Sequence, residues 1–362
     1  MSRTFGLVGL PNAGKSTIFN ALTLAGARVE AYPFCTIEPH HGVASVPDAR
    51  LDQLHALFPE KRKVPTTIEV VDIAGLVEGA SQGEGLGNQF LAEIRGVEAI
   101  LHVVRCFEDP DVAHPMGSLD VRRDIRVVEG ELLAKDRETL ERRRERSAKA
   151  ARTGDKAAQE EVALLDRLLE AVKRGKPIRA LSFSSHDLPL LREISPLTAK
   201  PVLYVANVGD AGENELSQAV EEEARESGAG WIVIRGKLEA ELGEACANEG
   251  ERTAFLHEYG LAESALVRLV REAYRLLAVI TFYTVEGPEV RAWTVPAGMR
   301  APDAGAAIHT DFRDRFVLAE VMHLADLLAA GSEHALREGG KIRRAGREYT
   351  VQDGDVIHFI SA

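Results

Sequence analysis

A glycine-rich turn with one lysine and one serine follows the first apolar run of the sequence. Residues 5–8 have the composition of a buried strand, and residues 17–22 that of a helix. The spacing G-x-x-x-x-G-K-S is complete between them, with Gly9, Gly14, Lys15 and Ser16 at the fixed positions. In such a turn, backbone N–H groups surround phosphate oxygens, the lysine neutralises the β- and γ-phosphates, and the hydroxyl ligates Mg²⁺. A chance Gly-Lys-Ser is the alternative, and the strand-turn-helix context favours a phosphate-binding loop (P-loop).

Two motifs downstream match the parts of a nucleotide switch. Thr36 lies in an irregular stretch after the first helix, where a threonine hydroxyl can complete the Mg²⁺ shell; an ordinary loop threonine is the alternative. The β-branched strand at 66–71 ends in the D-x-x-G motif of Asp72 and Gly75. That motif places a carboxylate near the Mg²⁺ waters and a glycine N–H at the γ-phosphate. We expect the glycine-rich segment 79–88 to form a second, mobile switch.

These side chains need a parallel sheet to bring them together, and the later apolar runs predict one. Residues 99–104, 201–208 and 231–234 are expected to be buried strands of an α/β domain. The carboxyl ends of parallel strands meet at one edge of the sheet, where ligands bind. His114 follows the first of these strands, and we interpret it as the group that orients attacking water. A loop histidine without a catalytic role is the alternative.

Composition limits the class of protein. The chain has 362 residues, enough for two to three domains, and 44 basic against 56 acidic side chains give a net charge of −12. This charge disfavours nonspecific nucleic-acid binding over the whole surface. No apolar run reaches the ~18 residues of a membrane helix, and a signal peptide would overlap the P-loop strand. The three cysteines form no metal-like pair, so we expect a cytoplasmic protein with no membrane contact.

Residues 120–176 are rich in charge, with apolar side chains at helical spacing. A break at 152–155 predicts two antiparallel helices that form an arm inserted, as segment 120–199, in the P-loop domain. Basic side chains gather near the turn: Arg142, Arg143, Arg144, Arg146, Lys149, Arg152 and Lys156. They suggest an RNA contact, and a solvated helix face is the alternative.

The segment 278–362 predicts a small α+β domain after a P-loop domain of residues 1–277. Strands are expected at 280–285, 290–295, 347–351 and 355–361, with helices near 303–308 and 317–329. A second, smaller basic cluster consists of Lys341, Arg343, Arg344 and Arg347.

With these pieces placed, the chain resembles the YchF/Obg-like ATPase family, P-loop proteins related to translation factors. The matching segments are GLPNAGKST (9–17), YPFCTIEP (32–39), DIAGLVEGASQGEGLGNQFL (72–91), VRCFED (104–109), IHTDF (308–312) and GKIRRAGREYTVQDGDVIHF (340–359). The resemblance implies a coiled-coil arm, a C-terminal TGS domain of β-grasp type and a ribosome connection. It also implies site roles: phosphates on Asn12, Ala13, Gly14, Lys15, Ser16 and Thr17, Mg²⁺ on Ser16 and Thr36, and a base contact on Val208.

Two positions bear on mechanism and base choice. Leu76 occupies the place where many GTPases have a water-orienting glutamine, so hydrolysis must use another group or be slow. In the guanine motif N-K-x-D, the chain has Asn207, Val208 and Asp210. The missing lysine favours ATP over GTP, whereas Asp210, where the family usually has glutamate, keeps a GTP-preferring switch open.

The resulting hypothesis is a monomeric, Mg²⁺-dependent ATPase that switches with nucleotide and binds the ribosome and its RNA. Lys15, Gly75 and His114 are the expected catalytic residues, and Asp72 orients the Mg²⁺ waters. Asn12 is a candidate ligand for K⁺, or a brace of the loop. A nucleotide-gated scaffold with negligible turnover and a small-molecule kinase are the alternatives from other classes.

Overall fold

The computed structural model describes residues 3–27, 40–73, 86–246 and 249–362. The chain divides into two compact units. One, the P-loop unit, consists of Thr4–Gly42 and Glu69–Ala273, and the other, the C-terminal unit, of Met1–Arg3, Val43–Ile68 and Tyr274–Ala362. The division between Ala273 and Tyr274 lies a few residues before the end predicted for the P-loop domain at 277, and the segment Val43–Ile68 groups with the C-terminal segment and not with the P-loop.

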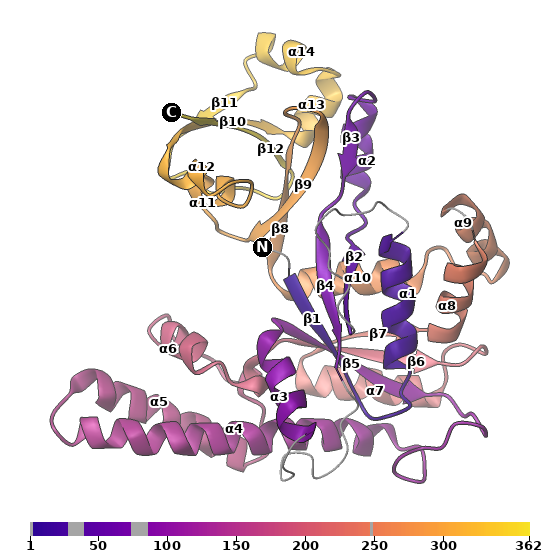
Figure 1. Ribbon diagram of the computed structural model, residues 1–362, viewed down its shortest axis with the longest axis vertical. Helices are drawn as coiled ribbons and strands as arrows, with labels where there is room; N and C mark the ends of the chain where they lie inside the picture. The colour runs from indigo at the N-terminus through magenta and orange to yellow at the C-terminus, as the bar shows by residue number, and fades with distance from the viewer. Residues whose placement is uncertain (1–2, 28–39, 74–85, 247–248) are drawn as a thin grey trace. The chain divides into compact units, whose positions relative to one another are not determined.

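The sheet that carries the P-loop has six strands in the order β2-β4-β1-β5-β6-β7 (Figure 1). Their bounds are β1 Arg3–Val8, β2 His41–Ser45, β4 Thr67–Asp72, β5 Ala99–Cys106, β6 Val202–Val208 and β7 Gly230–Ile234. The steps from β1 to β5, β6 and β7 are parallel, with Phe5 opposite Ala99 and Ile100 opposite Val202. Strands β5 and β6 are buried along their whole length, as expected of a parallel sheet covered on both faces. The predicted α/β fold with a mostly parallel sheet is confirmed.

Helices cover this sheet and connect its strands. They are α1 Lys15–Ala27, α3 Leu86–Gly96, α7 Glu215–Ser227, α8 Gly236–Ala245, α9 Glu249–Glu258 and α10 Ala265–Leu276. One apolar cluster joins the sheet to α3, α7 and the first half of α4, through residues such as Ile94, Ile125, Tyr204 and Val220. Helices α1 and α8 pack against each other. This core fixes the strand ends from which the functional side chains project.

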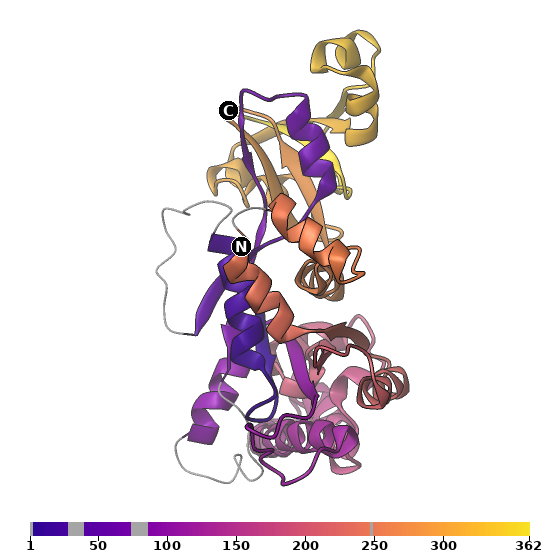
Figure 2. The ribbon, with the colours of Figure 1, turned by 90° about the vertical axis from the view of Figure 1, so that its right-hand side faces the viewer.

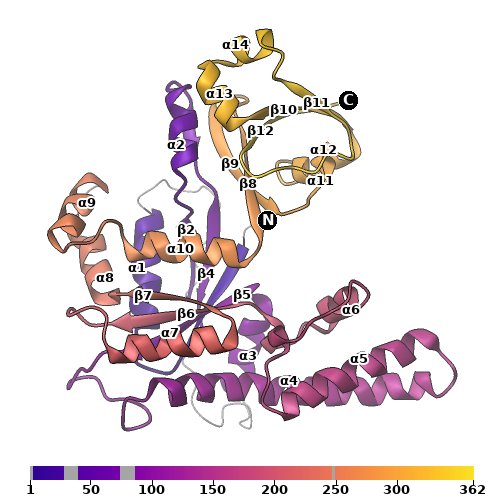
Figure 3. The same cartoon turned by 180° about the vertical axis from the view of Figure 1, so that it is seen from behind.

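The arm is an antiparallel helix pair, α4 Val121–Ala151 and α5 Lys156–Lys173, that extends sideways from the sheet (Figures 1 and 3). Gly154 adopts a φ of 88° in the turn, and Asp155 caps α5 by accepting from the N–H of Ala158. The helices share their own apolar cluster, in which Leu140, Leu165 and Leu168 are fully buried. Short elements η2 Ile178–Ala180, α6 Asp187–Ile194 and η3 Leu197–Ala199 lead back to β6. The arm thus has the two helices that the apolar spacing predicted and the turn that the break at 152–155 predicted.

The C-terminal unit contains a second six-stranded sheet, in the order β11-β10-β12-β8-β9-β3. Its strands are β3 Arg62–Val64, β8 Val279–Thr284, β9 Glu289–Pro296, β10 Phe316–His323, β11 Arg343–Ala345 and β12 Asp355–Ser361. Its helices are α2 Ala49–Ala56, α11 Ala301–Gly305, α12 Asp311–Asp314, α13 Leu324–Ala330 and α14 Glu333–Glu338 (Figure 2). Strand β3 pairs in parallel with β9, with Arg62 opposite Glu289. This pairing explains why the segment 43–68 belongs to the C-terminal unit.

Two predictions for the C-terminal unit were wrong. The stretch predicted as a helix at 317–329 begins as strand β10, and only Leu324–Ala330 is helical. A short apolar run fits either state locally, and the antiparallel pairing of β10 with β12 selects the strand. The segment 347–351 forms only an isolated bridge between Thr350 and Arg300, and the edge strand is β11 instead.

Candidate nucleotide-binding site

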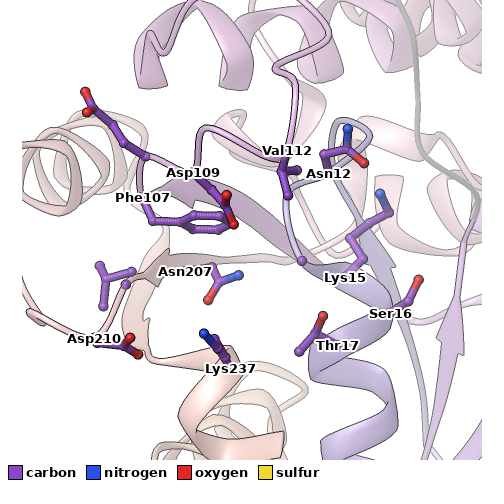
Figure 4. Close-up of a pocket in the computed structure, with 14 residues that line it drawn as sticks. Asn12, Lys15, Ser16, Thr17, Phe107, Asp109, Val112, Asn207, Asp210 and Lys237 are labelled. Carbon is purple, nitrogen blue, oxygen red and sulfur yellow. The ribbon is translucent and has the colours of Figure 1, made fainter.

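A pocket of about 580 Å³ lies at the carboxyl ends of β5 and β6 and the start of α1. Its lining comprises Asn12, Gly14, Lys15, Ser16, Thr17, Phe107, Glu108, Asp109, Val112, Asn207, Val208, Gly209, Asp210 and Lys237. Figure 4 shows Lys15 and Ser16 at one side of the pocket and Asp210 at the other, with Phe107 and Asn207 between them. The pocket therefore joins the phosphate-loop residues predicted from the sequence to the residues predicted to contact the base.

The backbone of the P-loop has the conformation that its glycines permit. Gly14 has a φ of 91°, and a Cβ placed on it would lie 2.1 Å from Nδ2 of Asn207. A Cβ on Gly9 would lie 2.3 Å from the carbonyl oxygen of Val103. A Cβ at Gly9 would require the backbone at Val103 to shift, and one at Gly14 would require the buried side chain of Asn207 to shift. Glycine is thus required at both fixed positions by contacts as well as by φ at Gly14.

Lys15 is 7% exposed, and its ammonium donates to the carbonyl oxygens of Gly9 (3.2 Å) and Leu10 (3.0 Å). Burial lowers the pKa of Lys15, and the nearby Asp72 carboxylate opposes that shift. A buried ammonium held by two neutral carbonyls is poorly compensated, because isolated charges are costly away from water. The side chain is therefore suited to a strongly anionic partner such as a phosphate.

The donor set for a divalent cation begins with Ser16 and Asp72. The Ser16 hydroxyl donates to Oδ2 of Asp72 at 2.7 Å, joining the start of α1 to the end of β4. Asp72 is 8% exposed, and its Oδ1 has no hydrogen-bond partner among the described residues. A buried carboxylate oxygen without a partner needs a cation or water, and oxygen donors are those that Mg²⁺ prefers. These two residues fit the predicted Mg²⁺ site.

Asn207 connects the P-loop to the far side of the pocket. Its Nδ2 donates to the carbonyl oxygen of Ala13 at 3.0 Å, and its Oδ1 accepts from the N–H of Gly236 at 3.0 Å. The side chain is 4% exposed. Both ends of the amide therefore hold the P-loop against the start of α8. The N-K-x-D motif predicted a base contact for Asn207 and not this bracing role.

The base-contact end of the pocket combines an aromatic wall with two exposed charges. Phe107 is stacked under the guanidinium of Arg105, 4.7 Å from the ring centroid, and Arg105 donates to the carbonyl oxygen of Phe107. Val208 is buried at the end of β6, and Asp210 and Lys237 are exposed at the pocket. An apolar wall with one acceptor and one donor can hold a purine ring by stacking and hydrogen bonding.

Sequence reasoning missed six of the lining residues: Phe107, Glu108, Asp109, Val112, Gly209 and Lys237. Most of them follow the carboxyl end of β5, and Lys237 follows β7. Their position directly after buried strands was the available signal, because ligands gather at that edge of a parallel sheet.

His114 and Asn12 lie differently from what their predicted roles require. The Nε2 atom of His114 is 2.8 Å from Oδ2 of Asp124, and the histidine is not among the residues that line the pocket. Asn12 has a φ of 64°, and its Nδ2 donates to the carbonyl oxygen of Ala113 at 2.9 Å. This bond matches the bracing alternative for Asn12 and leaves its Oδ1 available to a ligand.

Three residues of interest, Thr36, Gly75 and Leu76, lie outside the residues that the structure describes, as does most of the predicted second switch. Thr36 and Gly75 therefore stay predictions. In the described parts of the chain, no helix is both long and apolar enough to cross a membrane.

Comparison with protein-family models gives two matches. MMR_HSR1, described as a 50S ribosome-binding GTPase, matches residues 4–146. YchF-GTPase_C, described as a protein of unknown function, matches residues 279–361.

Curated relatives resemble the chain from end to end. The "Ribosome-binding ATPase YchF" of Bacillus subtilis is 47% identical over 99% of both chains, and that of Escherichia coli O157:H7 is 45% identical over 98% of both. Among solved structures, the Schizosaccharomyces pombe YchF GTPase superposes with a TM-score of 0.90 at 35% identity, covering 99% of this chain and 98% of that one. A GTP-binding protein from Pyrococcus horikoshii, 21% identical with a TM-score of 0.64, shares the fold.

Proposed function

Because the chain belongs to the YchF family, we propose that it is an Mg²⁺-dependent ATPase that binds the ribosome as a cytosolic monomer. The observation that carries the nucleotide part is the P-loop, in which buried Lys15 and Ser16 line one pocket and the Ser16 hydroxyl donates to Asp72. The ribosome-binding part of the proposal rests on the relatives, which are named ribosome-binding ATPases.

The phosphate end of the site works through charge. Lys15 binds the β- and γ-phosphates in place of its two carbonyl partners, while loop N–H groups and the start of α1 hold the remaining oxygens. Ser16 and Asp72, with Thr36 as the further predicted ligand, would hold Mg²⁺, which would supply positive charge next to the phosphates when bound. Gly75 is proposed to contact the γ-phosphate through its N–H. Thr17 lines the same pocket at the start of α1 and is proposed to contact the phosphates.

ATP is proposed to bind more tightly than GTP, because the lysine that packs along the base in N-K-x-D proteins is replaced by the buried Val208. Competitive titration should show at least a several-fold preference for ATP, on the order of 1 kcal/mol. A clear preference for GTP that disappears in Asp210→Ala would contradict this part of the proposal.

Asn12 is proposed to ligate K⁺ through Oδ1, the amide atom that is not used in the hydrogen bond from Nδ2 to Ala113. A monovalent cation beside the phosphates would supply positive charge in a site where Leu76 replaces the usual glutamine. Turnover should be faster in K⁺ than in Na⁺ at equal ionic strength, and equal rates in the two salts would exclude this role.

His114 is proposed as the residue that orients attacking water. Its loop follows β5, whose end lines the pocket through Phe107 to Asp109. We expect His114→Ala to bind ATP normally and to lose turnover by roughly tenfold or more. Unchanged turnover would remove His114 from the mechanism.

The arm is proposed to contact ribosomal RNA through its tip. Three arginines of the predicted basic patch are engaged with acidic side chains: Arg142 with Glu138, Arg143 with Glu161 and Glu193, and Arg144 with Asp166. In the described part of the chain, no acidic side chain lies within ion-pair distance of Arg146, Lys149, Arg152 or Lys156. The positive charge free to meet phosphates is thus concentrated around the turn at 152–155.

Two charge-reversal variants distinguish the basic side chains around the turn from the arginines that are paired with acidic side chains. Replacing Arg146, Lys149 and Arg152 with glutamate should weaken ribosome co-sedimentation and flatten its salt dependence, since each lost phosphate contact reduces the salt slope by about 0.7–0.9. Changing Arg142, Arg143 and Arg144 to glutamate, a matched reversal of three paired arginines, should have a smaller effect. If binding survives the tip reversal at the same salt, the tip is only a solvated helix face.

One assay distinguishes the proposed function from the alternatives. Phosphate release should proceed without any acceptor and should change on addition of ribosomes. Binding of ATP with no release would indicate a nucleotide-gated scaffold, and release that depends on a small-molecule acceptor would indicate a kinase.

A further inference from the structure

The side chain of His114 is packed away from the pocket in a position where both of its ring nitrogens are engaged. Nδ1 lies 3.2 Å from the N–H of Met116, which donates to it. Nδ1 therefore carries no proton, and Nε2 carries the proton that it donates to Asp124 over 2.8 Å. The side chains of His114 and Asp124 are 7% and 6% exposed.

This arrangement differs from a working histidine–carboxylate pair. A histidine that activates water needs one nitrogen fixed by its carboxylate and the other free to accept a proton. Here the carboxylate and a backbone N–H occupy both nitrogens, so His114 has no acceptor left for a water. The position that the structure shows is therefore unproductive for the proposed role of His114.

The surroundings of Asp124 hold the carboxylate firmly in place. Asp124 lies in the first turns of α4, and its Oδ1 accepts from Nε and Nη2 of Arg123 at 3.2 and 2.9 Å. Arg105, whose Nη1 is buried without a partner among the described residues, lines the same small cavity as His114 and Asp124. Asp124 thus has cationic neighbours that can compensate its charge if the histidine leaves.

The docked histidine is also connected to the P-loop. Asn12 donates to the carbonyl oxygen of Ala113, the residue before His114. A rearrangement of the Asn12 amide toward a ligand in the loop would remove this support from the His114 segment. Nucleotide occupancy and the release of the histidine are therefore joined by one hydrogen bond.

We propose that Asp124 is a positioning residue that holds His114 in a docked, inactive position, and that hydrolysis requires this contact to open. We call His114, Asp124 and Met116 the His114 latch. The inference rests on the proposed ATPase activity and on the role of His114 in it. It adds the regulation of that site: basal turnover is limited by the fraction of molecules in which the latch is open.

The test compares two single variants of the full-length protein. Asp124→Asn keeps the shape but replaces a charge-assisted hydrogen bond with a neutral one, which is roughly half as strong, so basal kcat should rise about fivefold with KM nearly unchanged. Asp120→Ala is the matched control, because Asp120 caps the same end of α4 through the N–H of Arg123 and does not contact His114. It should leave kcat unchanged.

A spectroscopic measurement detects whether the His114 latch is closed, independently of ATPase activity. In ¹⁵N-histidine NMR, the native protein and Asp120→Ala should show a slowly exchanging Nε2–H for His114, and Asp124→Asn should lose that protection. The double variant Asp124→Asn/His114→Ala should be as slow as His114→Ala alone.

The outcomes separate the latch from the activity on which it rests. Absence of phosphate release in the native protein refutes the proposed function itself. Native release with kcat unchanged or lowered in Asp124→Asn refutes the latch and leaves the ATPase standing. An Nε2–H of His114 that exchanges rapidly in the native protein also refutes the latch.

Discussion

Replacing Asn207 with alanine should both destabilise the P-loop unit and weaken ATP binding. The substitution leaves the carbonyl oxygen of Ala13 and the N–H of Gly236 without their buried partner. Each unsatisfied buried group costs about 1–3 kcal/mol, so we expect a loss of roughly 2–4 kcal/mol in the free energy of unfolding. Because the same amide fixes the P-loop at Ala13, ATP affinity should fall by about tenfold or more.

The two tryptophans allow this loss to be assigned to one unit. Trp231 lies on β7 in the P-loop unit, and Trp293 lies on β9 in the C-terminal unit. In a Trp293→Phe background, urea unfolding followed by fluorescence reports on Trp231 alone. The fluorescence midpoint then measures the P-loop unit, and titration with ATP gives the affinity of the same variant.

Asn214→Ala provides the matched control. Asn214 also uses both ends of its amide, donating to the carbonyl oxygen of Cys106 at 2.8 Å and capping α7 through the N–H of Ser217, but it does not line the pocket. It should lower stability by a similar amount and leave ATP affinity unchanged. If Asn207→Ala weakens ATP binding without any loss of stability, Asn207 acts only as a ligand contact and the bracing argument is refuted.

Three further predictions follow from the site and its core. Gly14→Ala should abolish ATP binding, because its Cβ would meet Asn207 at 2.1 Å, whereas Gly130→Ala, which meets nothing within 4 Å in the middle of α4, should raise stability by up to about 1 kcal/mol. Isothermal titration and urea unfolding check both, and ATP binding by Gly14→Ala would contradict the first. Ser16→Ala should reduce Mg²⁺-dependent hydrolysis at least tenfold, and full activity at low Mg²⁺ would show that Ser16 is not a ligand. Burial, with Arg179 and Lys15 nearby, lowers the pKa of His102 to about 3 from 6.5. Between these two pH values His102 is protonated in the unfolded chain and neutral in the folded protein. Stability is then complete above pH 6.5 and falls toward pH 3, by about 2 kcal/mol at pH 5, and His102→Phe should remove that part of the pH dependence.

Many of the elements that surround the pocket could be predicted from the sequence because their signals are local. The P-loop combines fixed residue types with a strand before it and a helix after it, and each part is set by neighbours in sequence. The arm was predicted from apolar spacing on two helices and a glycine between them. Buried strands β5 and β6 were recognised as continuous apolar runs.

Other features depend on residues far apart in the chain. The amide of Asn207 braces Ala13 across 194 positions, and Lys237 reaches the pocket from a different strand end than the residues of the base motif. The arginines at 142–144 resembled free basic side chains in sequence, yet α5 and α6 supply carboxylates to two of them. No local pattern encodes which side chain a folded helix will meet.

The sequence by itself determined the chemistry that the site can perform, since phosphate binding needs a particular set of residue types at a particular spacing. Only the tertiary structure decided that β3 completes the C-terminal sheet beside β9, 227 residues away. It also decided that His114 faces Asp124 and not the pocket. The physical reason is that residue types fix what a side chain can bind, whereas its actual partner is selected by long-range pairing and packing, which a short window of sequence does not contain.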